Sequence, residues 1–387
     1  MKNFIKLILV IALTAGTVFA VEAAKKEKKA KVTDPRLLKV MKLTKSPKDT
    51  QFLAAGEQLK TSHRAGRGFD VTSNDEELWY AQPGNVGKGQ PGLTKIHETY
   101  IIRKKNGKRE YMTLRYFGGC DNITIEKAAD GDYVWIGSHG DKWAKKSHYY
   151  RTRAISRFKF EPGTEINDGY AGETYYLGGA STARYMTCAV KPEEDILAVT
   201  TSNSGAVTIN IYSLQEARAL PDVELKVKTH WKGENVGEEE EYVVRRFKGK
   251  DLTSLDAKAS FVVEKKSKEN DGNPTKDPNF YTFRGFDVDK DYVYFVEGQH
   301  NKGKYTEEGP SKAFITVFDY AGRVVLEKRR IQAVAEKMLL ANMGITTTGY
   351  ADIFGFKIKG EDAYIGFSSY GPNKKGKNVH KAVVIKY

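Results

Sequence analysis

Short apolar runs separated by acidic or glycine-containing turns recur along the chain from residue 66 onward. Residues 67–71 read Arg-Gly-Phe-Asp-Val, and residues 284–288 repeat these residue types in the same order. Each copy leads into an acidic turn and then a second apolar run, at 78–81 or 292–296. Such a pattern predicts a strand, a tight turn and a second strand. The chain therefore carries a repeated β-hairpin unit.

Three weaker copies follow the same pattern, so we expect five units in all. First strands are predicted at 68–71, 123–125, 187–190, 284–288 and 354–358. Second strands are predicted at 78–81, 133–137, 196–199, 292–296 and 363–367. A third strand follows each pair, at 99–103, 154–160, 207–212, 314–320 and 382–387. Five meanders in series predict an all-β fold, a five-bladed β-propeller with irregular blades. The competing fold is one large sandwich, or two.

Three stretches depart from the repeat. Residues 223–263 fill the long interval between the third and fourth units, and we interpret them as outer strands plus a charged insertion around 238–241. Residues 265–278 are rich in Lys, Asn, Gly and Pro, which predicts a loop. A single helix is predicted at 330–342, where apolar residues from Ile331 to Leu339, including Met338, fall at helical spacing.

The N-terminus has the features of a secretory signal peptide. Lys2 and Lys6 precede an apolar stretch at 7–13, and small residues end at Ala20. We predict cleavage after Ala20, with a cut after Ala23 as the alternative, and no transmembrane segment in the mature chain. An uncleaved anchor is the other interpretation. The expected organisation is a signal peptide at 1–20, a basic tether at 21–50 and the propeller at 51–387, in a protein exported to the periplasm or beyond.

Charge narrows the class of partner. The formal net charge is +14, and removal of Lys2 and Lys6 with the signal peptide leaves +12. A basic exported protein is attracted to polyanions. The sequence contains no recognition helix, zinc finger or aromatic RNA-binding motif, so we expect a glycan or anionic envelope polymer rather than nucleic acid.

The two cysteines leave two possibilities open. Cys120 and Cys188 could form a disulfide in an oxidising compartment, or remain as buried thiols. Neither has another Cys or His at ligand spacing, so we expect no metal site. We expect no cofactor.

The strand order of a propeller predicts where a ligand would bind. The loops after the second strands return to the face at which the first strands begin. These loops, at 82–85, 138–143, 201–204, 297–301 and 368–372, are rich in amide, hydroxyl and imidazole groups. Arginine forks bind phosphate or carboxylate, and aromatic rings stack on sugars. The predicted ligand-binding residues are Arg67, Asn122, His139, Arg184, Tyr185, Arg284, Gln299, His300 and Tyr370. A structural alternative is that Arg67 and Arg284 only neutralise Asp70 and Asp287, or hold neighbouring backbone in place.

Catalysis has weaker support. No nucleophile elbow, Walker loop or zinc-protease motif is present. Carboxylates expected near the same face are Asp121, Asp141, Glu297 and Asp352, and a pair of them could hydrolyse a glycoside. We therefore favour a monomeric, non-enzymatic binding protein, with a glycoside hydrolase and a protein-docking scaffold as alternatives.

The repeat also resembles a known group of proteins. Arg-Gly-Phe-Asp-Val followed by Asp-Tyr-Val-Tyr-Phe-Val-Glu-Gly at 291–298 is similar to the blades of the helveticin J and teichoic acid biosynthesis protein C group, which includes propellers of phage receptor-binding proteins. The segments 134–138, 155–160, 363–367 and 384–387 fit the same resemblance, which spans 66–387. It implies a five-bladed propeller with a bacteriocin-like or wall-polymer-recognising role at bacterial surfaces. No functional residue is carried over by a shared motif.

Overall fold

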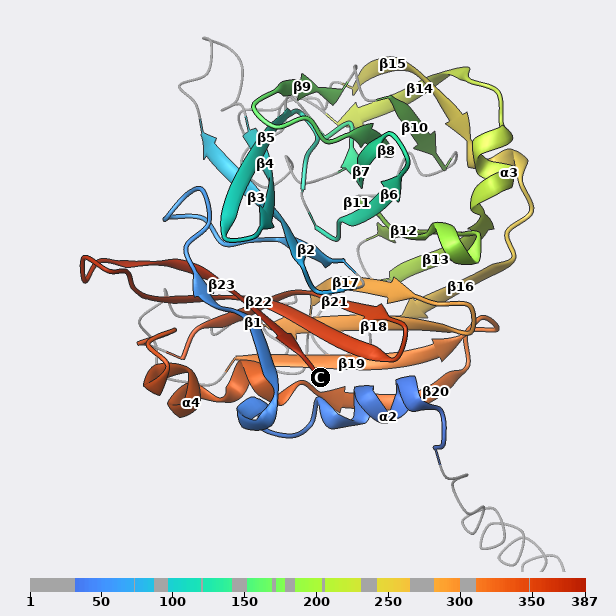
Figure 1. Cartoon of the computed structure of the whole chain (residues 1–387). Coiled ribbons are helices and arrows are strands. Elements are labelled where there is room, and N and C mark those ends of the chain that lie inside the picture. Colours follow the sequence, from blue (N-terminus) through green and yellow to red (C-terminus); the bar gives the residue numbers. More distant parts are fainter. Residues whose placement is uncertain are drawn as a thin grey trace, which may run out of the picture.

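Five sheets stand around a central axis as a five-bladed β-propeller (Figure 1), which confirms the predicted fold class. The computed structural model describes residues 32–72, 74–86, 97–119, 121–140, 152–168, 172–177, 185–203, 206–230, 242–264, 282–299, 311–347 and 349–387. The innermost strands are β2 (Gly68–Val71), β6 (Thr124–Ala128), β11 (Tyr185–Lys191), β17 (Thr282–Val288) and β21 (Ala351–Lys359). Each contacts the next, and β21 contacts β2 again, so the ring is closed.

Each blade continues outward from its innermost strand by antiparallel pairing. In blade 1, β2 is followed by β3 (Glu77–Val86), β4 (His97–Lys105), β5 (Lys108–Arg115) and β9 (Glu165–Asn167), the last parallel to β5. In blade 2, β6 is followed by β7 (Gly131–Ser138), β8 (Ala154–Lys159) and β10 (Glu173–Tyr176). Blade 3 contains β11, β12 (Ile196–Asn203), β13 (Ala206–Ser213) and β16 (Ala259–Glu264). Blade 4 contains β17, β18 (Tyr292–Gln299), β19 (Lys312–Asp319) and β20 (Val324–Arg330). Blade 5 contains β21, β22 (Asp362–Pro372), β23 (Asn378–Lys386) and β1 (Gln51–Glu57).

All fifteen predicted strand positions lie in strands of the five blades, with bounds that shift by a few residues. The outer strands expected at 223–263 are also present, but two of them extend blade 2. There, β14 (Val223–His230) and β15 (Tyr242–Asp251) form a hairpin that adds to β10 through a parallel pairing. The acidic run at 238–241 and the loop at 265–278 lie outside the described residues.

Residues 35–50, expected to be part of a tether, belong instead to the fold. Helix α2 (Pro35–Lys42) begins where Asp34 accepts a hydrogen bond from the Arg36 backbone and Pro35 occupies the first turn. Its apolar face is buried, with Leu37 and Val40 packed against the core. A 3₁₀ turn, η1 (Pro47–Asp49), leads from there into β1. The predicted signal peptide and residues 21–31 of the tether lie outside the described residues.

Strand β1 completes the last blade from the opposite end of the chain. It pairs with β23, so that Gln51 lies opposite Lys386 and Glu57 opposite Ala382. The first described strand and the last strand therefore close the ring together.

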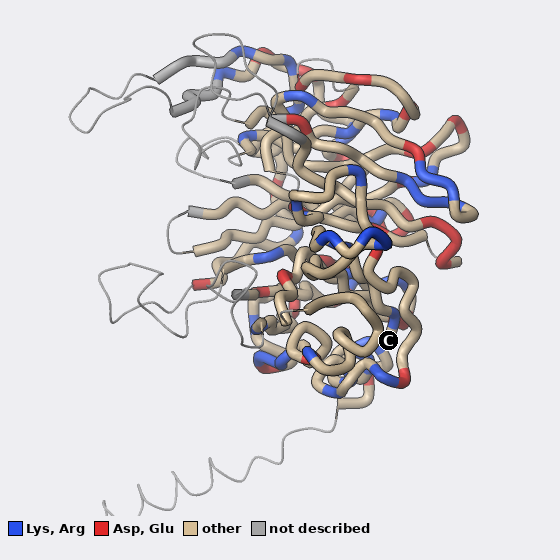
Figure 2. Tube along the Cα trace, turned by 90° about the vertical axis from the view of Figure 1, so that its left-hand side faces the viewer, with Lys and Arg blue, Asp and Glu red and all other residues tan. Residues whose placement is uncertain are grey.

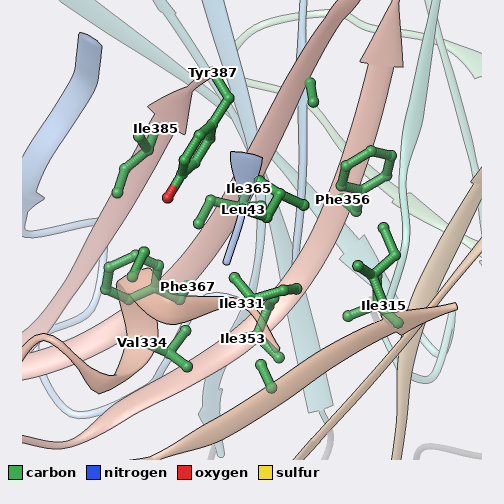
Figure 3. Close-up of a cluster of buried hydrophobic side chains, with 14 of the residues drawn as sticks. Leu43, Ile315, Ile331, Val334, Ile353, Phe356, Ile365, Phe367, Ile385 and Tyr387 are labelled. Atoms are coloured by element: carbon green, nitrogen blue, oxygen red, sulfur yellow. The ribbon is translucent and has the colours of Figure 1, made fainter. Parts of the chain in front are cut away.

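The helix predicted at 330–342 is divided into two short pieces. Arg330 ends β20, and η6 (Gln332–Ala335) and α4 (Lys337–Asn342) meet at Glu336, whose backbone leaves the helical region (φ −81°, ψ 61°). Met338, expected on the apolar face, is 71% exposed. The side chains that enter the core between blades 4 and 5 include Ile331 and Val334 (Figure 3). The other short helices are η4 (Pro192–Glu194), α3 (Leu214–Ala219) and η5 (Leu252–Ser254).

The aspartate of the Arg-Gly-Phe-Asp-Val repeat ties its blade to the next one. Asp70 Oδ2 accepts a hydrogen bond from the backbone N of Ile125 in blade 2 (2.7 Å), and Asp287 Oδ2 accepts one from Ile358 N in blade 5 (2.8 Å). In blade 2 the same strand position holds Thr124. Buried acceptors facing buried N–H groups stabilise the ring because unpaired groups there would be costly.

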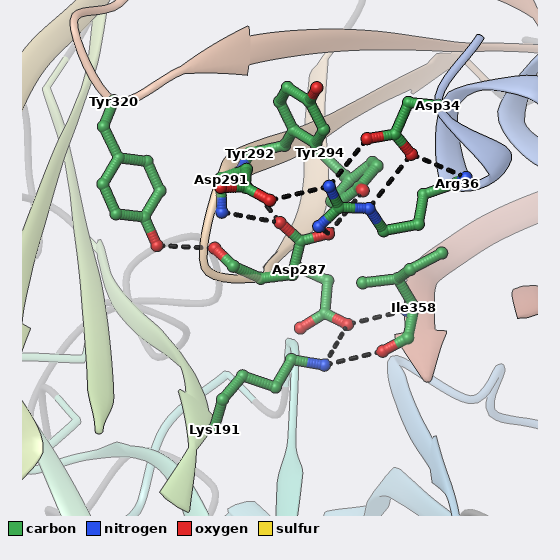
Figure 4. A network of polar contacts seen from close by, with 10 residues as sticks. Asp34, Arg36, Lys191, Asp287, Asp291, Tyr292, Tyr294, Tyr320 and Ile358 are labelled. Atoms are coloured by element: carbon green, nitrogen blue, oxygen red, sulfur yellow. Dashed lines mark hydrogen bonds and ion pairs between the residues drawn. The ribbon is translucent and has the colours of Figure 1, made fainter. Parts of the chain in front are cut away.

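Lysines, rather than the arginines of the repeat, neutralise these two aspartates. Lys359 Nζ lies 3.0 Å from Asp70 Oδ1, and Lys191 Nζ lies 2.9 Å from Asp287 Oδ2 and 2.7 Å from the carbonyl of Ile358 (Figure 4). Burial tends to raise the pKa of Asp70, but Lys359 and Lys357 outweigh it and hold that pKa below its usual value. The prediction that Arg67 and Arg284 neutralise Asp70 and Asp287 is therefore wrong.

Candidate binding site at the entrance face

The two ends of the propeller axis differ in chemistry. We call the end at which the innermost strands begin the entrance face, and the end with the tight turns after those strands the turn face. Asp and Glu residues are frequent in the tight turns, and Figure 2 shows their positions in red along its right-hand edge. The acids in or next to these turns include Asp75, Glu76, Asp130, Asp132, Glu193, Glu194, Asp195, Asp289, Asp291, Glu361 and Asp362.

The turn face contains a cavity of about 360 Å³ whose charges are largely compensated from within. Lys191, Asp289 and Lys359 contribute to its lining. Arg36 of α2 forms ion pairs with Asp289 (3.0 Å) and Asp291 (2.7 Å), as Figure 4 illustrates for Asp291. Tyr294 and Tyr320 donate further hydrogen bonds to Asp289, and so anchor the turn that carries it. These contacts give the turn face a structural role.

At the entrance face the two repeated arginines each reach into the following blade. Arg67 Nη1 lies 4.0 Å from Asp121 Oδ1, and Arg284 Nη2 lies 3.0 Å from Asp352 Oδ1. The side chain of Arg67 is 33% exposed and that of Arg284 is 14% exposed. Both predicted residues thus lie at blade junctions.

Asn122 is buried where blades 2, 3 and 4 meet. Its Nδ2 donates to the carbonyl of Cys188 in blade 3 (2.6 Å), and the side chain is buried. Its Oδ1 faces Gly285, where a Cβ atom would lie only 3.3 Å away and where φ is +138°. The glycine of the repeat is therefore needed for close approach, and Asn122 connects three blades rather than standing on an open rim.

His380 and two tyrosines form an aromatic group that the sequence did not single out as a unit. The ring of His380 lies 5.9 Å from that of Tyr350 and 5.1 Å from that of Tyr370, both nearly edge to face. Tyr370 is a predicted site residue and is partly exposed. Tyr370 and His380 are directly opposite each other on β22 and β23, so the pairing of these strands could have revealed their contact.

The electrostatic surroundings keep His380 neutral. Burial lowers the pKa of His380 to about 4, against the effect of Asp352, while His63, Arg64 and Arg67 add to the lowering. These charged groups therefore lie within electrostatic range of one another at the entrance face.

We expect His380 to make stability depend on pH between about 6.5 and 4. In that window the unfolded chain binds a proton at this site and the folded chain does not, so the free energy of unfolding falls as pH falls. The urea midpoint of the wild type should drop across this window more than that of His380→Gln. Parallel pH profiles for the two proteins would contradict the assignment.

Several polar groups predicted on the rim are buried hydrogen-bonding partners instead. His139 is 2% exposed, and its ring stacks 3.9 Å from that of Phe247. Gln82, from the first returning loop, binds the backbone of Thr61 and Arg64. Ser368 accepts a hydrogen bond from Gly66 N. Gln82 and Ser368 thus hold the 61–66 segment in place. Because His139 is buried, it is not an accessible site residue.

Other predicted residues cannot be placed. Arg184, His300, Asp141 and Cys120 lie outside the described residues, as do the side chains of Tyr185 and Gln299. Cys188 is described and has a free thiol. Burial raises the pKa of this thiol to about 12.

The three described carboxylates among those considered for glycoside hydrolysis are each engaged by a cation. Besides the pairs of Asp121 and Asp352 with arginines, Glu297 Oε2 lies 2.7 Å from Lys328 Nζ. Because Lys328 is on β20, Glu297 faces the outer part of blade 4, whereas Asp352 is on the innermost strand of blade 5. Within the described residues no group of three or more His, Cys, Asp or Glu side chains could hold a metal ion. None of the helices in this part of the chain is long and apolar enough to cross a membrane.

The entrance face retains hydrogen-bonding capacity that its own side chains do not use. Within the described part of the chain, the buried side-chain atoms without a hydrogen-bond partner include Arg64 Nε, Asn122 Oδ1, Arg284 Nε and Asp352 Oδ1 at this face. Asp352 Oδ1 is close to Arg284 Nη2, but that contact is an ion pair without hydrogen-bond geometry. Buried polar atoms of native proteins are normally paired, so this concentration indicates a place where a polar ligand or water binds.

Comparison with known proteins does not assign the chain to a family. No protein-family model matches the chain, and no curated protein matches it either. Among solved structures, the tail fiber of a Staphylococcus aureus phage has 9% identity and a TM-score of 0.48, over 87% of this chain and 52% of that chain. This chain thus spans about half the length of the fiber. A Helicobacter pylori β clamp in complex with 5-chloroisatin has 9% identity and a TM-score of 0.09, over 91% of this chain and 96% of that chain. The resemblance to the helveticin J and teichoic acid biosynthesis protein C group stays a prediction.

Proposed function

We propose that this protein is an exported, monomeric, non-enzymatic propeller that binds a cell-envelope glycan or anionic envelope polymer at its entrance face. The observation that carries the proposal is the set of unsatisfied polar atoms on Arg64, Arg284 and Asp352. Donors and acceptors occur side by side there, as recognition of hydroxyl groups requires. The excess of arginine over aspartate adds a preference for a ligand with phosphate or carboxylate groups.

The aromatic group supports a sugar as the unit that is recognised. Tyr370 is partly exposed beside His380, and a tyrosine face can cover the apolar side of a sugar ring. Export is proposed from the signal-like N-terminus, which would place the protein where envelope polymers occur.

The proposal predicts loss of binding when both repeated arginines are removed. On an array of neutral and phosphate-bearing bacterial polysaccharides, Arg67→Ala/Arg284→Ala should lose at least about tenfold in affinity, since charge-assisted hydrogen bonds contribute roughly 1.5–3 kcal/mol each. Arg67→Ala alone should bind more weakly than the wild type while leaving the Arg284 pair with Asp352 intact.

A matched control removes two arginines elsewhere. Arg246 and Arg323 are 60% and 80% exposed and also form ion pairs, with Glu224 and Asp319. Arg246→Ala/Arg323→Ala changes the net charge equally and should bind as the wild type does. Equal binding by both double variants would rule out the entrance face as the site.

A further inference from the structure

A groove of about 880 Å³ lies in blade 5, beside the hairpin where β22 returns to the entrance-face end of the propeller. One side is formed by the end of β1 and the next residue, Gln58, and the other by the hairpin that joins β22 and β23. Arg109 of blade 1 also reaches it. The groove is therefore formed by β1, by the β22–β23 hairpin and by one residue of blade 1.

Basic side chains dominate this groove. Arg109, Lys374, Lys375 and Lys381 line it, and Glu57 is the only acid among its lining residues. Glu57 is engaged by Lys104 and by Arg109, whose Nη2 lies 3.2 Å away. The groove therefore has an excess of positive charge that its own acid does not cancel.

The position of each lysine is set by the backbone around it. Lys381 is 8% exposed and its Nζ donates to the carbonyl of Gly344 (2.8 Å), which holds the ammonium group on the groove side of β23. Lys374 and Lys375 are exposed at the hairpin tip, and neither forms an ion pair with a described residue. Asn373 Oδ1 accepts hydrogen bonds from the backbone N of Lys375 and Lys377, so the tip has a defined turn.

This groove is separated from the entrance-face site by the strand that contributes to both. His380 and Lys381 are consecutive residues of β23, and consecutive side chains of a strand point to opposite faces. His380 meets Tyr350 and Tyr370, whereas the aliphatic stem of Lys381 lies against Gly56 at the end of β1. A ligand in one site need not touch the other.

We propose that this groove is a second binding site, for an extended chain of phosphate groups. The two exposed lysines at the hairpin tip, with Arg109 and the largely buried Lys381 beside them, suit a ligand whose negative charges repeat along its length. Ammonium groups bind phosphate oxygens as point charges without a fixed geometry. A lone phosphate ion would engage only part of the set. The proposal is independent of the entrance-face function, and it rests on the charge and shape of the groove.

Binding of long-chain inorganic polyphosphate to the full-length mature protein tests this site directly. Lys374→Glu/Lys375→Glu should weaken the affinity at least about tenfold, because two charge-assisted contacts become repulsive. Orthophosphate at the same phosphate concentration should bind far more weakly than the polymer. Equal affinities for the two would show a single-phosphate site and overturn the proposal of an extended ligand.

The control variant carries the same change in charge on another hairpin. Lys226 and Lys248 are exposed on β14 and β15, so Lys226→Glu/Lys248→Glu should retain wild-type affinity for polyphosphate within about twofold, since distant charges are screened by salt. If both double variants weaken binding equally, the attraction comes from overall charge and the groove is refuted. A wild type without affinity for polyphosphate refutes it as well.

The two sites can fail separately. Arg67→Ala/Arg284→Ala should keep its affinity for polyphosphate, and Lys374→Glu/Lys375→Glu should keep its affinity for a neutral polysaccharide recognised at the entrance face. The affinities of the protein for dextran sulfate and for polyglutamate test whether a polymer of sulfate or carboxylate groups binds as well as one of phosphate groups. Binding of either as tight as that of polyphosphate would contradict the assignment of phosphate as the ligand.

Discussion

Replacement of Asp287 by alanine is expected to lower the free energy of unfolding by about 3–5 kcal/mol, the range found when one member of a buried ion pair is removed. The Asp287 side chain is 1% exposed and that of Lys191 is 5% exposed, so the substitution leaves an ammonium group inside the protein without its carboxylate. It also removes the acceptor for Ile358 N, which joins blade 4 to blade 5. Urea denaturation of the two proteins would measure the difference.

Two further substitutions separate charge from hydrogen bonding. Asp287→Asn keeps an oxygen for Ile358 N and should lose less stability than Asp287→Ala. Asp291→Ala removes a carboxylate that is 46% exposed and paired with Arg36, and should cost no more than about 1 kcal/mol, as exposed pairs do. If Asp287→Ala were no more destabilising than Asp291→Ala, the buried pair could not be a main tie between the blades.

The repeated strands could be predicted because their signal is local. Each first strand pairs with the second across a tight turn, and the alternation of apolar residues is complete within a few residues of that turn. The ties between blades could not be predicted in the same way. Lys359 and Asp70 are close only because the ring closes, and nothing near Asp70 in the sequence indicates a lysine from blade 5 as its partner.

The candidate site was predicted in part for a related reason. A polar residue at the exposed tip of a loop and a buried polar residue that anchors a loop give the same signal in the sequence. Only their burial in the structure distinguishes them. Gln82, Asn122 and His139 belong to the second kind, each enclosed by backbone or rings from other segments. Arg67 and Arg284 could be identified because the repeat itself marked them, although their partners in the next blade could not.

The start of the fold was missed even though its sequence contains a signal. Asp34 before Pro35 is a recognisable helix start, and Leu37 and Val40 have helical spacing, but a helix of eight residues gives little periodicity to detect. For β1 there was less to find, because its burial pattern is weak and its partner lies at the other end of the chain. Pairing over such a separation depends on closure of the whole ring.

Truncation of this N-terminal segment is therefore expected to have the second large effect. A chain that begins at residue 32 should unfold at the same urea concentration as one that begins at residue 21, because α2 and β1 are both retained. A chain that begins at residue 51 loses α2, and with it the buried side chains of Leu37, Val40 and Leu43. At roughly 1.5–3 kcal/mol for each apolar side chain buried, the loss is about 5–9 kcal/mol.

A chain that begins at residue 58 should lose the closed ring altogether. It lacks β1 as well, so β23 becomes an unpaired edge and Ala54 leaves the core between blades 5 and 1. Since domains of this kind are stable by only about 5–15 kcal/mol in total, this protein should be unfolded or aggregated at room temperature. Circular dichroism and size-exclusion chromatography of the three chains would measure the series. A folded, monomeric product from residue 58 would show that the ring closes without the N-terminal strand. Residues 32–57 would then not be required for the fold.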